Sequence, residues 1–79
     1  MQTIFIQVKC EMGQAYDVAQ GIVELDGVSE VFSTLGHYDL LVKCFLPGDQ
    51  DAGHFVTDKI QRGKGVQDTH TIITFNAFS

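Results

Sequence analysis

The chain has 79 residues, a formal net charge of −5 and only five Lys and Arg residues. This length fits one domain, residues 1–79, and a domain this small buries only about 60% of the surface that its unfolded chain exposes. The shortage of basic residues argues against direct DNA or RNA binding, which needs clustered Lys and Arg. We therefore predict a single domain, without a DNA-binding domain, that gains stability by associating with other copies.

The cysteines and the N-terminus argue against secretion and against a metal site. Two cysteines cannot form a disulfide framework, and no Cys-x-x-Cys spacing suggests zinc. Cys10 and Cys44 fall within apolar runs, where buried free thiols are expected. No signal peptide is recognisable, and no apolar run approaches the ~20 residues of a membrane span. We therefore expect a cytoplasmic protein. The histidines lack metal-ligand spacing, so we also expect no metal, and we expect no cofactor.

The first part of the chain predicts a strand followed by a helix. Apolar residues alternate over Gln2–Cys10, which is typical of a strand with one dry face. Over Gln14–Glu24 the period changes to that of an amphipathic helix. The predicted buried stripe of this helix is Ala15, Val18, Ala19, Ile22 and Val23. Gly27 then suits the positive φ of a cap or turn.

Two further strands are predicted on either side of a polar loop. Val28–Thr34 is the less apolar of the two, as suits an edge strand. Leu40–Leu46 has apolar residues on both faces, which favours a central position. The loop Gly36–Asp39 reads Gly-His-Tyr-Asp, which is more polar chemistry than a tight turn requires. We interpret it as a contact for a small ligand or for a neighbouring subunit.

A second helix and a last strand complete the pattern. Asp49 or Asp51 is placed to cap a helix that runs to about Gln61. Its residues at helical spacing are Ala52, Phe55, Val56, Lys59 and Ile60. A glycine-rich turn ends this helix. Val66 to about Phe75 then alternates as a strand.

The order β-α-β-β-α-β predicts a fold of the α+β class. It is the ferredoxin-like arrangement, a four-stranded antiparallel sheet with two helices on one face. The other sheet face then has no cover within the chain. Residue parity assigns to that face Phe5, Val31, Leu41, Phe45 and Ile72. A second subunit must cover it, sheet against sheet, as in a dimeric α+β barrel.

Four segments carry a resemblance to a known family. They are Val28–Val31 (Val-Ser-Glu-Val), Gly36–Lys43 (Gly-His-Tyr-Asp-Leu-Leu-Val-Lys), Phe55–Ile60 (Phe-Val-Thr-Asp-Lys-Ile) and Gly65–Thr71 (Gly-Val-Gln-Asp-Thr-His-Thr). With them the chain resembles the effector-binding (RAM) domain of the Lrp/AsnC feast/famine transcriptional regulators. A complete regulator also carries a helix-turn-helix domain, for which this chain has no residues. It therefore resembles the stand-alone versions of the domain.

The resemblance implies an amino-acid-binding and oligomerisation module related to transcription regulation. Family dimers form through the open sheet face and assemble into rings, for which an octamer or decamer is expected. The effector lies between neighbouring dimers. The residues of this chain that match the family's site are Leu35, Gly36, His37, Tyr38, Asp39, Thr69 and Thr71. A full-length Lrp/AsnC regulator is a further implied partner.

Each of these residues also has an ordinary structural role. Asp39 can accept a hydrogen bond from an ammonium, and backbone N–H groups around Gly36 can hold a carboxylate. Thr69 and Thr71 offer hydroxyls on one face of a strand. Alternatively, Asp39 caps its own turn, the threonines are ordinary strand residues, and Tyr38 packs between subunits. The residues alone leave both interpretations open.

Two other functions share this fold class, because a fold does not decide a function. The first is a small dimeric α+β barrel enzyme, such as a cofactor-independent monooxygenase or a haem-degrading type. Such an enzyme needs a pocket between the sheet and the helices of one subunit. Bulky residues are expected to fill that space here: Ile4, Ile6, Val8, Leu40 and Val42. We therefore predict no enzymatic activity. The second is an ACT-like amino-acid-binding module, which pairs its sheets side by side.

Overall fold

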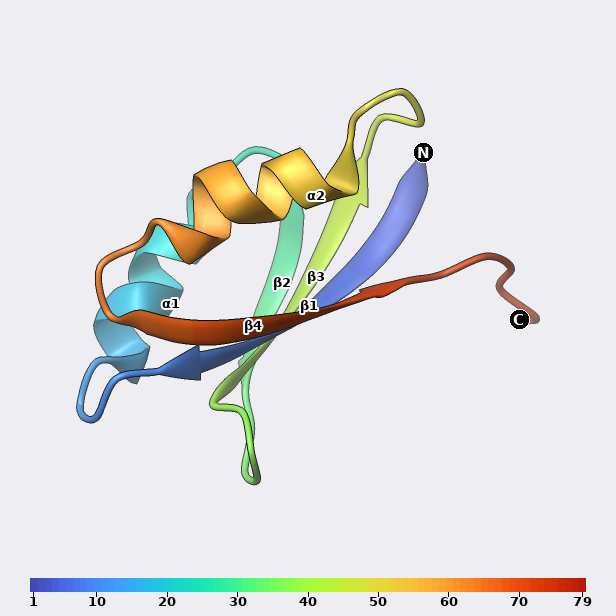
Figure 1. Ribbon diagram of the computed structural model, residues 1–79. Helices are drawn as coiled ribbons and strands as arrows, with labels where there is room; N and C mark the ends of the chain where they lie inside the picture. The colour runs from blue at the N-terminus through green and yellow to red at the C-terminus, as the bar shows by residue number, and fades with distance from the viewer.

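One antiparallel sheet of four strands, in the order β2-β3-β1-β4, organises the chain (Figure 1). The computed structural model describes all 79 residues. The elements are β1 (Gln2–Cys10), α1 (Ala15–Val23), β2 (Val28–Ser33), β3 (Leu40–Leu46), α2 (Ala52–Phe55), η1 (Val56–Gln61) and β4 (Val66–Ile73). This order and topology confirm the ferredoxin-like α+β fold. The predicted edge position of β2 and central position of β3 are confirmed as well.

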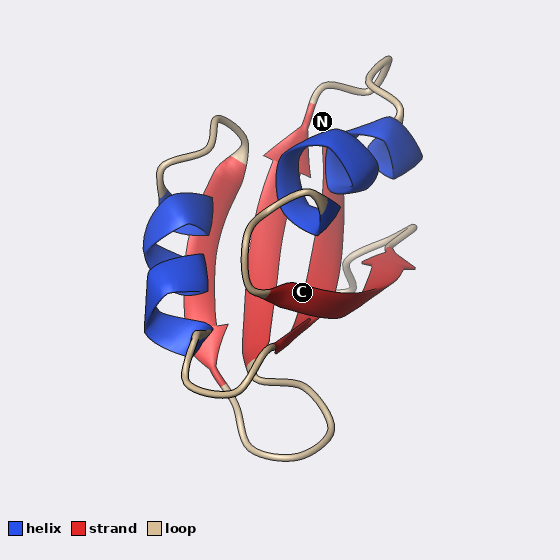
Figure 2. Ribbon diagram, turned by 60° about the vertical axis from the view of Figure 1, so that its left-hand side comes forward, coloured by secondary structure: helices blue, strands red, loops and turns tan.

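The helices cover one face of the sheet, which we call the closed face (Figure 2). Its residues come from alternate positions of the two central strands, and the most deeply buried of them are Ile4, Ile6, Val8, Val42 and Cys44, each 0% exposed. Val18 and Ile22 pack on them from α1. No polar or charged residue is buried in this core. None of the helices combines the length and the apolar character that a membrane crossing requires.

The second helix begins at a predicted cap and then changes its hydrogen bonding. The Asp51 side chain accepts a hydrogen bond from the backbone N–H of His54 at 3.0 Å, and this bond lowers the pKa of the Asp51 carboxyl. After the four residues of α2, η1 continues as a π-helix, whose bonds close over five residues. Phe55 and Ile60, five residues apart, therefore lie on the same side, and both are buried.

The other face of the sheet has no helix over it, and we call it the open face. Its large apolar side chains are Phe5, Phe32, Leu41, Phe45 and Ile72. All five are partly or well exposed within the chain. The prediction of an uncovered apolar face is therefore confirmed for Phe5, Leu41, Phe45 and Ile72.

The prediction that Val31 lies on the open face is wrong. A β-bulge between Val28 and Glu30 inserts one residue into β2 and shifts the parity of the strand beyond it. Val31 consequently pairs with Val42 and packs against the core. Phe32 takes the open side, opposite Leu41, and is 47% exposed. Sequence parity cannot show a bulge, because the bulge depends on how two strands pair.

The end of α1 differs from prediction in one residue. Val23 does not join the buried stripe and is 51% exposed. It is the last residue of a nine-residue helix and lies about 100° around the axis from the buried Ile22. Gly27 has the predicted positive φ, +94°, and a Cβ there would meet the Leu46 side chain at 3.0 Å. Glycine is therefore required where the chain turns from α1 into β2.

Candidate functional site

The loop between β2 and β3 extends beyond the end of the sheet (Figure 1). Two hydrogen bonds close its base: the Thr34 backbone N–H donates to the Asp39 carbonyl at 2.9 Å, and the Thr34 hydroxyl donates to the Tyr38 carbonyl at 2.8 Å. Gly36 has φ +123°, which favours glycine. Leu35, beside it, is fully exposed. The loop is thus held at its base and open at its tip.

Asp39 connects this loop to the end of β1. Its backbone N–H donates to the Val8 carbonyl at 2.9 Å, and its Oδ2 accepts a hydrogen bond from the Cys10 backbone N–H at 2.7 Å. The second bond lies where a bulge shifts the register of β1 at Lys9 and Cys10. Burial, and then the nearby Asp39 charge, raise the pKa of the Cys10 thiol. The other oxygen, Oδ1, makes no hydrogen bond within the chain.

The tip of the loop carries a run of free backbone donors. The N–H groups of Leu35, Gly36, His37 and Tyr38 donate to no group within the chain. All four residues lie in the exposed or half-exposed part of the loop. Consecutive free N–H groups are suited to binding an anion such as a carboxylate. The loop therefore presents both an acceptor, Asp39 Oδ1, and a set of donors.

A shallow hollow of about 320 Å³ lies beside the loop. It is lined by Gln7, Thr34, Leu35, His37, Tyr38, Leu40 and Leu41. The Tyr38 ring tilts toward His70 of β4, with 6.3 Å between ring centroids and 35° between the planes. His70 is absent from the residues that the sequence singled out. His70 lies two residues before Ile72 on β4, so both side chains are on the open face. This alternation is the signal in the sequence that could have placed His70 there.

Thr69 and Thr71 lie on the closed side of β4 rather than beside Tyr38. They pair with the core residues Val8 and Ile6 in the register of β1 and β4. The Thr69 hydroxyl accepts a hydrogen bond from the Gln61 side-chain amide at 2.7 Å. Within one chain, the sheet therefore separates the two threonines from the Tyr38 side of the loop. The structure gathers Leu35–Asp39 into one element but does not bring the threonines to it.

The interior offers no room for chemistry between the sheet and the helices. The residues expected to fill that space do so: Ile4, Ile6, Val8, Leu40 and Val42 are at most 2% exposed. No three His, Cys, Asp or Glu side chains come close enough together to hold a metal ion. The candidate site is therefore at the surface, on the β2–β3 loop.

Comparison with known proteins points to one family. The family model of the Lrp/AsnC ligand binding domain matches residues 3–79. Among curated proteins, the HTH-type transcriptional regulator FL11 of Pyrococcus abyssi is 35% identical over 69 residues, which are 87% of this chain and 45% of that protein. The chain thus spans less than half the length of the curated relatives it matches. These relatives are named as transcriptional regulators and not as enzymes.

Two solved structures match over nearly their whole length. TTHA0845 from Thermus thermophilus superposes with a TM-score of 0.88 at 30% identity, covering 100% of this chain and 99% of that one. The hypothetical protein PHS023 from Pyrococcus horikoshii gives a TM-score of 0.86 at 29% identity, covering 99% of this chain and 94% of that one. Chains of similar length and fold have therefore been solved without a further domain in the same chain.

Proposed function

The chain belongs to the Lrp/AsnC ligand-binding domain family, and we propose that it binds a free amino acid in a site formed between copies of the chain. The family match over residues 3–79 is the observation that carries this proposal. The loop geometry supports it, because the loop offers both a hydrogen-bond acceptor for the ammonium and hydrogen-bond donors for the carboxylate of a zwitterion. A cytoplasmic location, regulation without enzymatic activity and a full-length Lrp/AsnC regulator as partner belong to the same proposal, since the relatives are named as transcriptional regulators.

The loop supplies complementary groups for the two charges of an amino acid. Asp39 Oδ1, free of partners within the chain, accepts from the ammonium. The free N–H groups of Gly36 and His37 donate to the carboxylate. Asp39 Oδ2 stays bound to the Cys10 N–H and holds the side chain in place. In this proposal one aspartate combines a binding role with a structural one. The structural role differs from the predicted cap of its own turn, because the carboxylate bonds to Cys10 of β1.

The positions of Thr69 and Thr71 support a site shared between chains. They lie on the closed side of an edge strand, and the Tyr38–His70 pair lies on the open side. A ligand that touches the loop and both hydroxyls must therefore take the threonines from a neighbouring copy. The composite site contains Leu35, Gly36, His37, Tyr38 and Asp39 from one copy and Thr69 and Thr71 from another.

Assembly in this proposal begins at the open face. A second copy covers Phe5, Phe32, Leu41, Phe45 and Ile72, sheet against sheet. Dimers then associate into a ring, an octamer or decamer, which creates the boundaries where the effector binds. Exposed apolar residues of this number on one face of a small chain mark an interaction surface.

The first experiment tests assembly. Leu41→Glu places a carboxylate in the middle of the open face, and its burial in a dimer would be costly. We expect light scattering to give the mass of a monomer, 8.7 kDa, for this variant and a multiple of it for the wild type. Tyr16→Glu is the matched control, since Tyr16 is exposed on α1. A wild type that stays monomeric at all concentrations contradicts the proposal.

The second experiment tests the ammonium partner. Asp39→Asn removes the charge but keeps an oxygen for the Cys10 N–H, so the fold is retained. We expect the amino acid that raises the Tm of the wild type to bind at least about tenfold more weakly, since a charge-assisted bond is worth ~1.5–3 kcal/mol. Calorimetric titration measures this. Asp49→Asn, the same change in the exposed turn after β3, is the control. Unchanged affinity in Asp39→Asn would show that another group binds the ammonium.

A further inference from the structure

The open face carries charged side chains among its apolar ones, and their signs balance. Glu30 lies opposite Lys43 across β2 and β3, and Lys9 lies opposite Asp68 across β1 and β4. This face is therefore neutral, and the rest of the chain carries the whole net charge of −5. A surface for nucleic acid or for a strongly charged protein would show one dominant sign. Balanced charge suits a surface that meets an identical copy of itself.

Lys43 lies in the middle of the open face rather than at its rim. β3 is a central strand, and the register places Lys43 between Phe5 of β1 and Glu30 of β2. The Lys43 side chain is half-buried within the single chain. A second copy that covers the face removes the water that solvates this ammonium. A buried ammonium without an anionic partner is costly, so the covering surface has to bring a carboxylate to it.

Lys43 and Glu30 do not neutralise each other within the chain. They are directly opposite across the strands, yet the only ion pair in the chain joins Arg62 and Asp58. The Lys43 ammonium instead lies 5.2 Å from the centre of the Phe45 ring, which attracts it but carries no net negative charge. Glu30, on the edge strand β2, is exposed. Both charges are therefore available to a second copy.

Glu30 is the better placed of the two carboxylates on this face. Asp68 already accepts a hydrogen bond from the backbone N–H of Thr69 at 2.9 Å, which holds its side chain against its own strand. It also lies opposite a lysine, Lys9, at the other end of β1 from the middle of the face. Glu30 has neither restraint and lies in the same cross-strand row as Lys43.

From this pattern we propose that Lys43 and Glu30 determine which chain covers the open face. The Lys43 ammonium of each copy pairs with the Glu30 carboxylate of the other. In a two-fold dimer every contact between unlike residues occurs twice, so each copy gives and receives one ion pair. A chain with like charges at both positions is rejected, because like charges that face each other in an interface are strongly unfavourable. This inference rests on the proposed assembly through the open face.

Charge reversals, made one at a time and then mixed, test this inference. Lys43→Glu makes positions 30 and 43 both acidic, and Glu30→Lys makes both basic. In a dilution series followed by light scattering, each variant alone should associate at least about tenfold more weakly than the wild type. An equimolar mixture should regain association, because both ion pairs can form between unlike chains. With one variant labelled with ¹⁵N, native mass spectrometry should show mainly mixed dimers.

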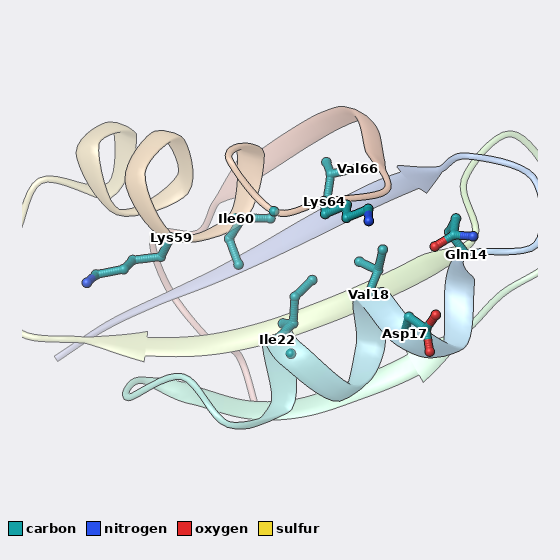
Figure 3. A pocket seen from close by; sticks show the side chains of 10 residues that line it. Gln14, Asp17, Val18, Ile22, Lys59, Ile60, Lys64 and Val66 are labelled. Carbon is teal, nitrogen blue, oxygen red and sulfur yellow. The ribbon is translucent and has the colours of Figure 1, made fainter.

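This rescue separates pairing between copies from pairing within one chain. Each variant has two charges of the same sign at positions 30 and 43, so no ion pair between these positions can form inside either chain. Asp17→Lys and Lys59→Glu are the matched controls, since they change the net charge by the same amounts. Both of these residues lie on the helical side of the sheet (Figure 3). The controls should associate like the wild type, alone and mixed.

The outcomes distinguish this inference from the assembly on which it rests. A mixture of Lys43→Glu and Glu30→Lys that associates no better than the separate variants overturns the inference. Single variants that associate as tightly as the wild type overturn it too. In both cases the wild type still associates, and the proposed assembly stands. A wild type that stays monomeric overturns the assembly itself and this inference with it.

Discussion

The two faces of the sheet are built from the same strands but reach different states. On β1, Ile6 belongs to the closed face and is fully buried, while its neighbour Phe5 belongs to the open face and stays partly exposed. The helices of the chain cover the closed side of the two central strands, and nothing in the chain covers the open face (Figure 2). The difference shows that the chain buries one side of the sheet by itself and leaves large apolar side chains exposed on the other.

The chemistry of the two faces differs as much as their burial. The closed face has no buried polar residue. On the open face, Glu30 pairs across the strands with Lys43, whose ammonium lies 5.2 Å from the centre of the Phe45 ring. The Tyr38–His70 pair lies on the same side. Apolar and aromatic residues mixed with a few polar ones are typical of an interface rather than of a core.

The largest effect on stability is expected when the same change, Ile→Ala, is made on the closed face and compared with the open face. Ile6→Ala, at a fully buried position, should lower the free energy of unfolding by ~2–5 kcal/mol, through lost burial and a cavity. Ile72→Ala, at a position that is 43% exposed within the chain, should cost only about 1 kcal/mol in dilute protein. Urea unfolding of both variants measures the contrast.

Protein concentration sharpens this contrast. If a second copy covers the open face, the cost of Ile72→Ala should grow as the protein concentration rises, because association stabilises only the folded state. The difference in unfolding free energy between Ile6→Ala and the wild type should not change with protein concentration. A cost of Ile72→Ala that does not change between micromolar and millimolar protein would argue against burial of that face.

The burial of Cys44 on the closed face predicts that the free energy of unfolding depends on pH. Burial raises the pKa of this thiol to about 11 from an ordinary value of 9.0. The unfolded thiol ionises near pH 9 and the folded one near pH 11, so full stability is present below pH 9 and falls as the pH rises to 11. The gap corresponds to about 3 kcal/mol.

Urea unfolding at about pH 8, 9.5 and 10.5 tests this effect. Cys44→Ala should be less stable than the wild type at the lowest pH, because it leaves a small void, but it should lose less stability at high pH. Cys10 contributes its own slope, so the difference between the two curves isolates Cys44. Parallel curves for the two proteins would show that water reaches the closed face.

The sequence predicted the fold well because the period of each element is a local property. The alternation of β1 and the stripe of Val18 and Ile22 on α1 follow from single elements and are confirmed. The capping role of Asp51 is equally local. The π-helical form of η1 is not local in this sense, since packing on the core decides how its turns close.

The candidate site could be predicted only in part. The loop Leu35–Asp39 stands out by composition, but the double role of Asp39 depends on the distant N–H of Cys10. Likewise, the contact of Tyr38 with His70 requires the pairing of β1 and β4. That Thr69 and Thr71 point away from the loop follows from the same register. Contacts between residues far apart in sequence are set by strand pairing, which periodicity does not specify.

The smallest of these effects tests the bulge in β2, which exchanges Val31 and Phe32 between the two faces. Val31→Ala, on the core side, should lower the free energy of unfolding by about 1 kcal/mol in dilute protein. Phe32→Ala removes a larger side chain from the open face and should cost less in the same assay, while it weakens association more. Urea unfolding and light scattering on both variants separate the two effects.

A residue-size argument alone predicts the opposite order, since phenylalanine has more apolar surface to lose than valine. The bulge reverses that order by turning the smaller residue inward. If Phe32→Ala proves the more destabilising variant in dilute protein, β2 pairs with β3 without the bulge. Val31 would then return to the open face, and the boundary between the two faces would run along β2 one residue away from where it lies here.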